Sequence, residues 1–182
     1  MSGKFNFDLR SDDWQRKLPE KLIIGRSDLE TDENIVLKLL AYVLLFRERL
    51  QISPQLHNEN IPFIPGVVQL DYQLNPALWV ECNDCTVQKL DKLAVKVHDA
   101  EIWVMNRTPE VMAELIRQMT HAKVRRDRYH LVAFDEEMFT KMVRLLHTRN
   151  EFYLLQADFE PPTLQFDFNG LWFDVPFYYE KF

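Results

Sequence analysis

Two acidic residues ten positions apart give this chain its clearest opportunity for metal chemistry. Asp71 lies in one apolar segment and Glu81 closes the next, with the turn-forming pair Asn75-Pro76 between them. This order predicts a β-hairpin whose two carboxylates reach the same edge of a sheet. Such carboxylates could bind a divalent cation and present it to a phosphodiester. The alternative interpretation is that both acids are simply solvated at the ends of strands.

A lysine usually completes such a site two positions after the glutamate, but that position holds Asn83. The helix predicted after Glu81 carries Lys89 and Lys92 along one face, because residues three or four apart lie on the same side of a helix. We expect Lys92, or else Lys89, to stand in for the missing lysine. The alternative is that these lysines form a solvated helix face.

Glu30 and Glu33 could supply a third ligand, since they lie three residues apart near the start of the first predicted helix. Acids in the first turn of a helix also stabilise its dipole, by about 0.3–1 kcal/mol. Judged from the residues alone, this effect on the dipole explains the two glutamates better than metal binding does.

Apolar periodicity places these candidates on helices and strands. Helices are predicted at residues 31–51, 87–97, 108–122 and 136–148. Strands are predicted at residues 67–74, 77–81, 101–105, 129–134, 152–156, 164–168 and 171–175, with a strand or turn at 4–9. Helices placed between the strands of a mixed sheet indicate a three-layer α/β domain, with a mixed central sheet and flanking helices.

Length and composition limit the remaining classes of protein. With 182 residues, the chain is expected to form a single domain over residues 1–182. Its longest apolar stretch, Leu39–Phe46, is less than half of a membrane span, and no signal peptide opens the sequence. We therefore expect a cytoplasmic protein without a membrane partner. A net charge of −6 argues against a surface that binds nucleic acid without regard to sequence.

Cys82 and Cys85 form a CxxC pair of the kind found in zinc sites and redox proteins. The chain has two cysteines in all, and none of its five histidines lies at a spacing that would complete a zinc site. The negative charges of the neighbouring Glu81 and Asp84 would also disfavour the deprotonated, thiolate form of either cysteine. We therefore do not expect a functional dithiol.

Several segments together resemble the YaeQ family. The residues that carry the resemblance are Leu29-Glu30-Thr31-Asp32-Glu33, Val36, Leu39-Leu40-Ala41, Glu48-Arg49-Leu50, Leu78-Trp79-Val80-Glu81, Lys89 and Lys92. The tail Trp172-Phe173 is compatible with the same pattern. The similarity covers roughly residues 26–175 and is typical of a divergent relative.

The resemblance implies the restriction-endonuclease-like fold of the PD-(D/E)XK nucleases, whose core runs helix, three strands, helix, strand. On this chain the core would occupy about residues 26–105, and a C-terminal α/β extension would occupy about residues 106–182.

The same resemblance implies a role for each candidate residue. Asp71, Glu81 and either Glu30 or Glu33 would bind Mg²⁺, which Mn²⁺ could replace. Lys92 or Lys89 would stabilise the charge that develops on the phosphate; Asn83 departs from the family pattern.

Two functional hypotheses follow from these observations. The first is a magnesium-dependent nuclease in which metal-bound water attacks a phosphodiester of nucleic acid in line. The second is a nuclease fold that has lost catalysis and acts as an interaction module for a protein partner. Asn83 and the acidic net charge favour the second. The sequence leaves open whether the chain is an enzyme, and we expect a monomer.

Overall fold

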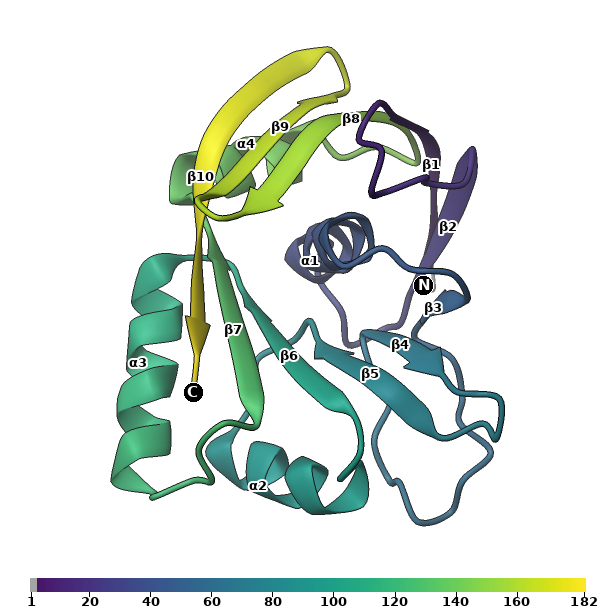
Figure 1. The fold of residues 1–182 in the computed structure, drawn as a ribbon. Coiled ribbons are helices and arrows are strands. Elements are labelled where there is room, and N and C mark those ends of the chain that lie inside the picture. Colours follow the sequence, from purple (N-terminus) through teal and green to yellow (C-terminus); the bar gives the residue numbers. More distant parts are fainter. Residues whose placement is uncertain (1–2) are drawn as a thin grey trace.

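One mixed β-sheet dominates the computed structural model, which describes residues 3–182. The helices are α1 (Asp32–Leu44), α2 (Val87–Lys96), α3 (Pro109–His121) and α4 (Glu136–Leu145). The strands are β1 (Gly3–Ser11), β2 (Lys21–Arg26), β3 (Leu50–Ile52), β4 (Val67–Leu70), β5 (Pro76–Glu81), β6 (Glu101–Asn106), β7 (Tyr129–Phe134), β8 (Arg149–Phe159), β9 (Pro162–Phe168) and β10 (Leu171–Lys181). They pair in the order β2-β1-β8-β9-β10-β7-β6-β5-β4-β3, and the sheet curls into a nearly closed barrel (Figure 1).

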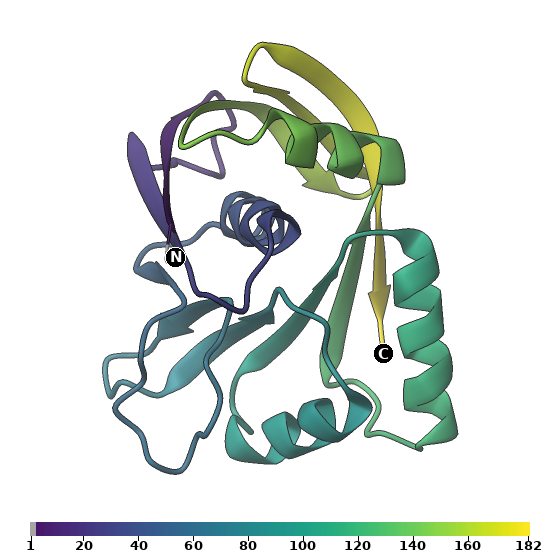
Figure 2. The same ribbon diagram turned by 180° about the vertical axis from the view of Figure 1, so that it is seen from behind.

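The concave side of the sheet wraps around α1, which lies at the centre of the molecule (Figures 1 and 2). Every residue of this helix from Ile35 to Leu44 is buried. A helix that is apolar on nearly all sides has to be enclosed, and the curled sheet together with α4 encloses it. Although α1 is apolar, no helix in residues 3–182 is both long and apolar enough to cross a membrane.

The strands β5, β6 and β7 are parallel neighbours, and α2 and α3 make the connections between them. Their side chains alternate between two cores. Leu78 and Val80 enter the inner core around α1, whereas Trp79 enters an outer core beneath α2 and α3. This part of the sheet therefore has helices on both faces, which confirms the predicted mixed α/β fold with flanking helices.

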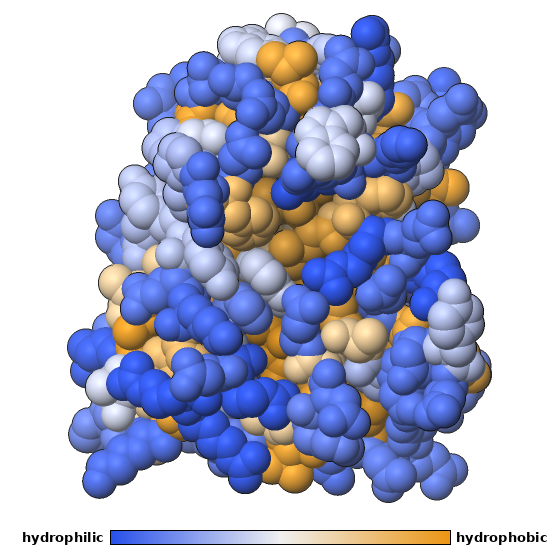
Figure 3. All heavy atoms as spheres, viewed as in Figure 1, coloured by the Kyte–Doolittle hydropathy of each residue, from blue (hydrophilic) through white to orange (hydrophobic). Residues whose placement is uncertain are grey.

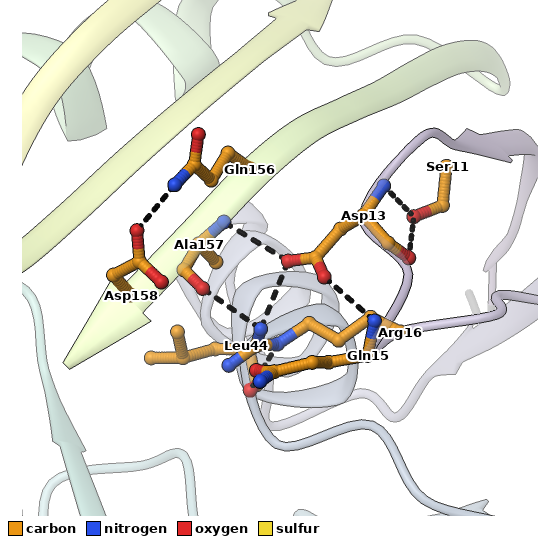
Figure 4. Close-up of polar contacts among 8 residues, drawn as sticks. All are labelled: Ser11, Asp13, Gln15, Arg16, Leu44, Gln156, Ala157 and Asp158. Atoms are coloured by element: carbon orange, nitrogen blue, oxygen red, sulfur yellow. Dashed lines mark hydrogen bonds and ion pairs between the residues drawn. The ribbon is translucent and has the colours of Figure 1, made fainter.

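A buried ion pair fastens the C-terminal end of α1 to β8 (Figure 4). Arg16 Nη1 lies 2.9 Å from Asp13 Oδ2, and both side chains are at least nine-tenths buried. Arg16 also donates hydrogen bonds to the carbonyls of Leu44 and Ala157, at 2.9 and 2.8 Å. The contact with Leu44 gives a partner to a carbonyl at the end of the helix, where the helix itself supplies none.

A hollow of about 330 Å³ lies over the same end of α1. Its lining is mainly apolar and consists of Gln15, Arg16, Leu44, Leu45, Phe46, Arg47, Trp103 and Phe159. On the face that Figure 3 shows, apolar side chains gather in the middle and mostly hydrophilic residues surround them. The inner core therefore reaches the surface near this end of the helix.

The structure corrects several element boundaries that the sequence predicted. Helix α1 ends at Leu44 and not near residue 51, since Leu45 already leaves the helical conformation; the chain then turns at Arg49, where φ is 65°, and enters β3. The short edge strands β2 and β3 were not predicted. Strands β8 and β10 extend well beyond the predicted ranges 152–156 and 171–175. Polar residues such as Arg149, Asn150 and Asp158 weaken the apolar signal at the ends of β8, and Pro176 interrupts the strand pattern of β10.

The Asp13–Arg16 pair allows a direct test of how the sheet holds α1. Replacing Arg16 with Met leaves Asp13 buried without its cation, so we expect a loss of about 3–5 kcal/mol in the free energy of unfolding. Urea unfolding of wild type and Arg16→Met measures it. The control is Arg10→Met, because the Arg10 side chain is 73% exposed and should change stability by less than about 0.5 kcal/mol. Equal effects of the two substitutions would contradict this role for Arg16.

Candidate functional site

Glu81 is the most deeply buried of the predicted site residues. It ends β5 on the same face as Trp79, two residues earlier, and is 2% exposed. Trp79 Nε1 donates a hydrogen bond to one carboxylate oxygen at 2.8 Å, and Lys89 Nζ lies 2.7 Å from the other. Both oxygens of Glu81 are therefore engaged by protein groups.

Lys89, and not Lys92, is the lysine that reaches Glu81 from α2. Thr86 caps this helix by accepting a hydrogen bond from the Lys89 amide at 3.2 Å, which places Lys89 in the first turn. The Lys89 ammonium also lies 5.6 Å from the centre of the Phe63 ring. Lys92 is exposed further along the helix, so the preference for Lys92 over Lys89 was wrong.

Asp71 lies at the other end of the β4–β5 hairpin from Glu81. Its Oδ1 accepts hydrogen bonds from the backbone amides of Gln73 and Asn75, at 2.8 and 2.9 Å, and so shapes the turn. The six residues of β5 separate this turn from Glu81 by about 17 Å at the rise of a β-strand. The expected metal site shared by Asp71 and Glu81 is therefore not formed.

Gly66 directly precedes β4 and packs closely against Cys82. Val67 is the first residue of β4 and pairs with Val80, and Gly66 comes directly before Val67. A Cβ atom at Gly66 would lie 2.7 Å from Cys82 Sγ and 2.8 Å from its Cβ. The close packing of Cys82 thus keeps any side chain, including a carboxylate, out of this position.

Glu30, which precedes α1, and Glu33, in its first turn, have separate roles. Glu30 forms an ion pair with Lys38, which is 1% exposed, and accepts a hydrogen bond from the Ser27 amide at 2.9 Å. Burial raises the pKa of Glu30, but the bonds from Lys38 and Ser27 outweigh burial and hold that pKa below its usual value. Glu33 accepts a hydrogen bond from the Thr31 hydroxyl at 2.9 Å. Neither glutamate contacts Glu81.

The residues named by the sequence therefore do not gather into a metal site. Within residues 3–182, no group of three or more His, Cys, Asp or Glu side chains is placed to hold a metal ion. Mg²⁺ prefers several oxygen ligands in near-octahedral geometry. A single buried carboxylate that already binds Trp79 and Lys89 does not meet that requirement, so these residues do not fit the metal that the resemblance implies.

A polar cleft of about 450 Å³ lies next to Glu81, at the carboxyl ends of β5 and β6. It opens between the first turn of α1 and one side of α3. Its lining includes Leu29, Thr31, Glu33, Asn34, Leu37, Asn83, Asp84, Cys85, Val104, Met105, Asn106, Arg107, Val111, Glu114, Leu115 and Gln118. This is the position where α/β sheets with parallel strands generally bind their ligands.

Two amide side chains shape the cleft. Asn34 on α1 donates a hydrogen bond to the Cys82 carbonyl at 3.3 Å and so ties the helix to the end of β5. Asn106 is 5% exposed and donates to the carbonyls of Val104 and Val132, at 3.4 and 3.1 Å. These bonds fix the walls of the cleft on both sides.

Three acids give the cleft a negative lining. Glu33, Asp84 and Glu114 face a single lining cation, Arg107. Glu114 bonds to Arg117 at 2.6 and 2.8 Å, and these bonds lower the pKa of Glu114 to about 2. The cleft is therefore rich in hydrogen-bond acceptors, and Arg117 balances the charge of Glu114, which leaves Glu33 and Asp84 with Arg107 as the other lining charges.

The CxxC pair is not built for thiolate chemistry. Burial, and then the charge of Glu81, raise the pKa of both thiols, that of Cys85 to about 12. Both cysteines are free in the structure.

Several residues that build the site were missed from sequence. Trp79 and Glu81 are two residues apart on a strand, which places them on one face, so their contact could have been anticipated. Lys38 lies within an apolar helix stripe, where a buried partner is required. By contrast, nothing in the sequence signals that Gly66 packs on Cys82.

Together these features define a mixed α/β protein with a barrel-like sheet, a buried acid–lysine pair and a polar cleft at the carboxyl ends of its parallel strands. The model of the YaeQ protein family matches residues 3–158, and the chain belongs to the YaeQ family.

Two solved structures share this fold. The YaeQ protein from Xanthomonas axonopodis pv. citri superposes with a TM-score of 0.77 at 17% sequence identity, covering 100% of this chain and 99% of that chain. The YaeQ protein from Pseudomonas syringae gives a TM-score of 0.74 at 15% identity, covering 98% and 95%. No curated protein matches the sequence.

Variants of the Glu30–Lys38 ion pair test whether Glu30 stabilises the fold. Glu30→Gln leaves the Lys38 ammonium buried without its anion, so we expect a loss of about 3–5 kcal/mol in the free energy of unfolding. Combining Glu30→Gln with Lys38→Met should recover most of that loss, because no charge is then buried. Thermal and urea unfolding measure both variants, with the half-buried Glu33→Gln as the control, because Glu33 bonds to the Thr31 hydroxyl and forms no ion pair with Lys38. If Glu30→Gln proves as stable as Glu33→Gln, Glu30 is not a structural partner of Lys38.

Proposed function

We propose that this YaeQ-family chain is a monomeric, cytoplasmic interaction module on a nuclease-like fold that has lost metal-dependent catalysis. The observation that carries the proposal is the state of Glu81. Its two carboxylate oxygens are bound to Trp79 Nε1 at 2.8 Å and to Lys89 Nζ at 2.7 Å, and Asp71 lies at the far end of the hairpin. The acid that could have activated a metal instead holds α2 against the sheet.

The order of elements supports the nuclease-like part of this proposal. From Asp32 to Asn106 the chain runs α1, β3, β4, β5, α2, β6. Strands β3, β4 and β5 are antiparallel neighbours, and β6 is parallel to β5. This is the helix, three strands, helix, strand order that the PD-(D/E)XK resemblance implies.

The charge of the cleft favours a protein partner over nucleic acid. Phosphate recognition depends on Lys and Arg side chains that replace condensed counterions. The cleft instead presents Glu33, Asp84 and Glu114 on a chain whose net charge is −6. Amide and carboxylate acceptors at Asn83, Asp84 and Gln118 suit the backbone and side-chain donors of a polypeptide.

A magnesium-dependent nuclease is the second candidate, and one contact favours it. Lys89 lies 2.7 Å from Glu81, so a lysine on the following helix does accompany the acid. For catalysis, Glu81 would have to leave Trp79 and acquire further oxygen ligands, which Asp71 cannot supply from the far end of the hairpin. The interaction module requires no such rearrangement.

Metal titration separates the two candidates. We expect isothermal calorimetry to detect no heat of site binding for Mg²⁺ or Mn²⁺, in wild type or in Glu81→Gln. Labelled DNA and RNA should stay uncut and unbound even at low salt, where phosphate contacts are strongest. Metal binding or cleavage that is present in wild type and absent in Glu81→Gln would refute the loss of catalysis.

Photo-crosslinking tests the cleft as the partner surface. A benzophenone amino acid at Asn83, inside the cleft, should give discrete protein adducts when the chain is illuminated in living cells. The matched control is Val95, which is 55% exposed on α2 and does not line the cleft. The same adducts from both positions, or none from Asn83, would count against a partner that binds here.

A further inference from the structure

The outer face of β1, β8, β9 and β10 carries no helix. The inner residues of β1, β8, β9 and β10 pack on α1 and α4, while α2 and α3 cover the region of β5 to β7. Phe152, Phe166 and Phe173 point inward and are buried. Their sequence neighbours point outward, to a surface that Figures 1 and 2 show uncovered. This outer face is polar but contains a large aromatic residue, Trp172, that is 48% exposed.

Strand pairing aligns four side chains in a row across this face. Arg10 pairs with Tyr153, Tyr153 with Asp167, and Asp167 with Trp172. The Arg10 guanidinium lies 4.7 Å from the centre of the Tyr153 ring. At one end of the row, Arg10 therefore stacks on Tyr153. At the other end, the exposed ring of Trp172 has no stacked cation among the described residues.

Two more carboxylates border the row. Asp8 pairs directly with Glu151 on the neighbouring strand, and like charges in that position destabilise a sheet. Asp8, Glu151, Asp167 and Trp172 line a hollow of about 500 Å³ together with Arg10 and Tyr153. Arg10 is the one cation among the residues that line this hollow, and it lies 4.0 Å from a further acid, Asp12. Lys21 of β2 borders the hollow as the cross-strand partner of Asp8.

We propose that this outer face docks an arginine-bearing segment of a partner protein. One guanidinium would stack on Trp172, as Arg10 already stacks on Tyr153 in the same row, and would donate hydrogen bonds to the adjacent Asp167. A second arginine of the same segment would reach Glu151 and Asp8, which lie two and three strands away from Trp172. A planar guanidinium suits both contacts, because it stacks on rings and binds carboxylates through paired donors. The docked cation also offsets the repulsion between Asp8 and Glu151. The site shares no residue with the cleft and stands independently of the function proposed there.

Short labelled peptides test the docking site. The probe is Gly-Arg-Ser-Arg-Gly, compared with the same peptide carrying citrulline in place of arginine and with Gly-Lys-Ser-Lys-Gly. We expect the arginine peptide to bind most tightly by fluorescence anisotropy and to shift the Trp172 indole resonance. Trp172→Ala, and separately Asp8→Asn combined with Glu151→Gln, should each weaken binding at least tenfold.

Matched variants keep the test specific. Trp14→Ala removes an indole that is 80% exposed outside the row, and Asp91→Asn combined with Glu59→Gln removes the same charge from other exposed positions. Both should leave the affinity unchanged. The proposal is overturned if no peptide binds, if citrulline binds equally well, or if the control variants weaken binding as much as the site variants. It is also overturned if sedimentation shows a dimer that Trp172→Ala dissociates, because the face would then bind a second copy of the chain.

Discussion

The enclosure of α1 by the curled sheet is the constraint on which the other features of this protein depend. A helix buried from Ile35 to Leu44 cannot remain on one side of a flat sheet, so the strands wrap around it. Its one buried charge, Lys38, requires an anion, and Glu30 supplies it. At the other end, Arg16 binds the Leu44 carbonyl. These ties hold the first turn of α1 beside the end of β5, where the cleft opens.

The same packing decides the role of the acids that first suggested a nuclease. Glu81 lies beneath α2, where Trp79 and Lys89 take both of its oxygens, whereas Asp71 shapes the turn at the far end of the hairpin. Glu30 is committed to Lys38. Each of these acids therefore has its own structural partner, and the partners lie in different parts of the fold.

The sequence predicted most of the fold but less of the site. Periodicity located the four helices and the β4–β5 hairpin, because their apolar faces are regular, and the resemblance to YaeQ proteins was confirmed. The sequence pattern failed for contacts between residues that are far apart along the chain. The ten-residue spacing of Asp71 and Glu81 could not reveal that strand β5 holds the two acids at opposite ends of the hairpin. Likewise the ion pairs Glu30–Lys38 and Asp13–Arg16 depend on how α1 sits inside the sheet, which local pattern does not encode.

The most direct test of the account is a titration of the isotope-labelled chain with paramagnetic Mn²⁺, followed by the amide resonances of residues around Glu81. A bound Mn²⁺ would broaden nearby signals strongly, so the method reports both binding and its location. We predict no selective broadening of Glu81, Cys82 or Lys89 beyond that of exposed acidic positions such as Glu59. Selective broadening at Glu81 and Cys82 that disappears in Glu81→Gln would contradict the account, since it would show a metal held by the acid that the structure assigns to Trp79 and Lys89.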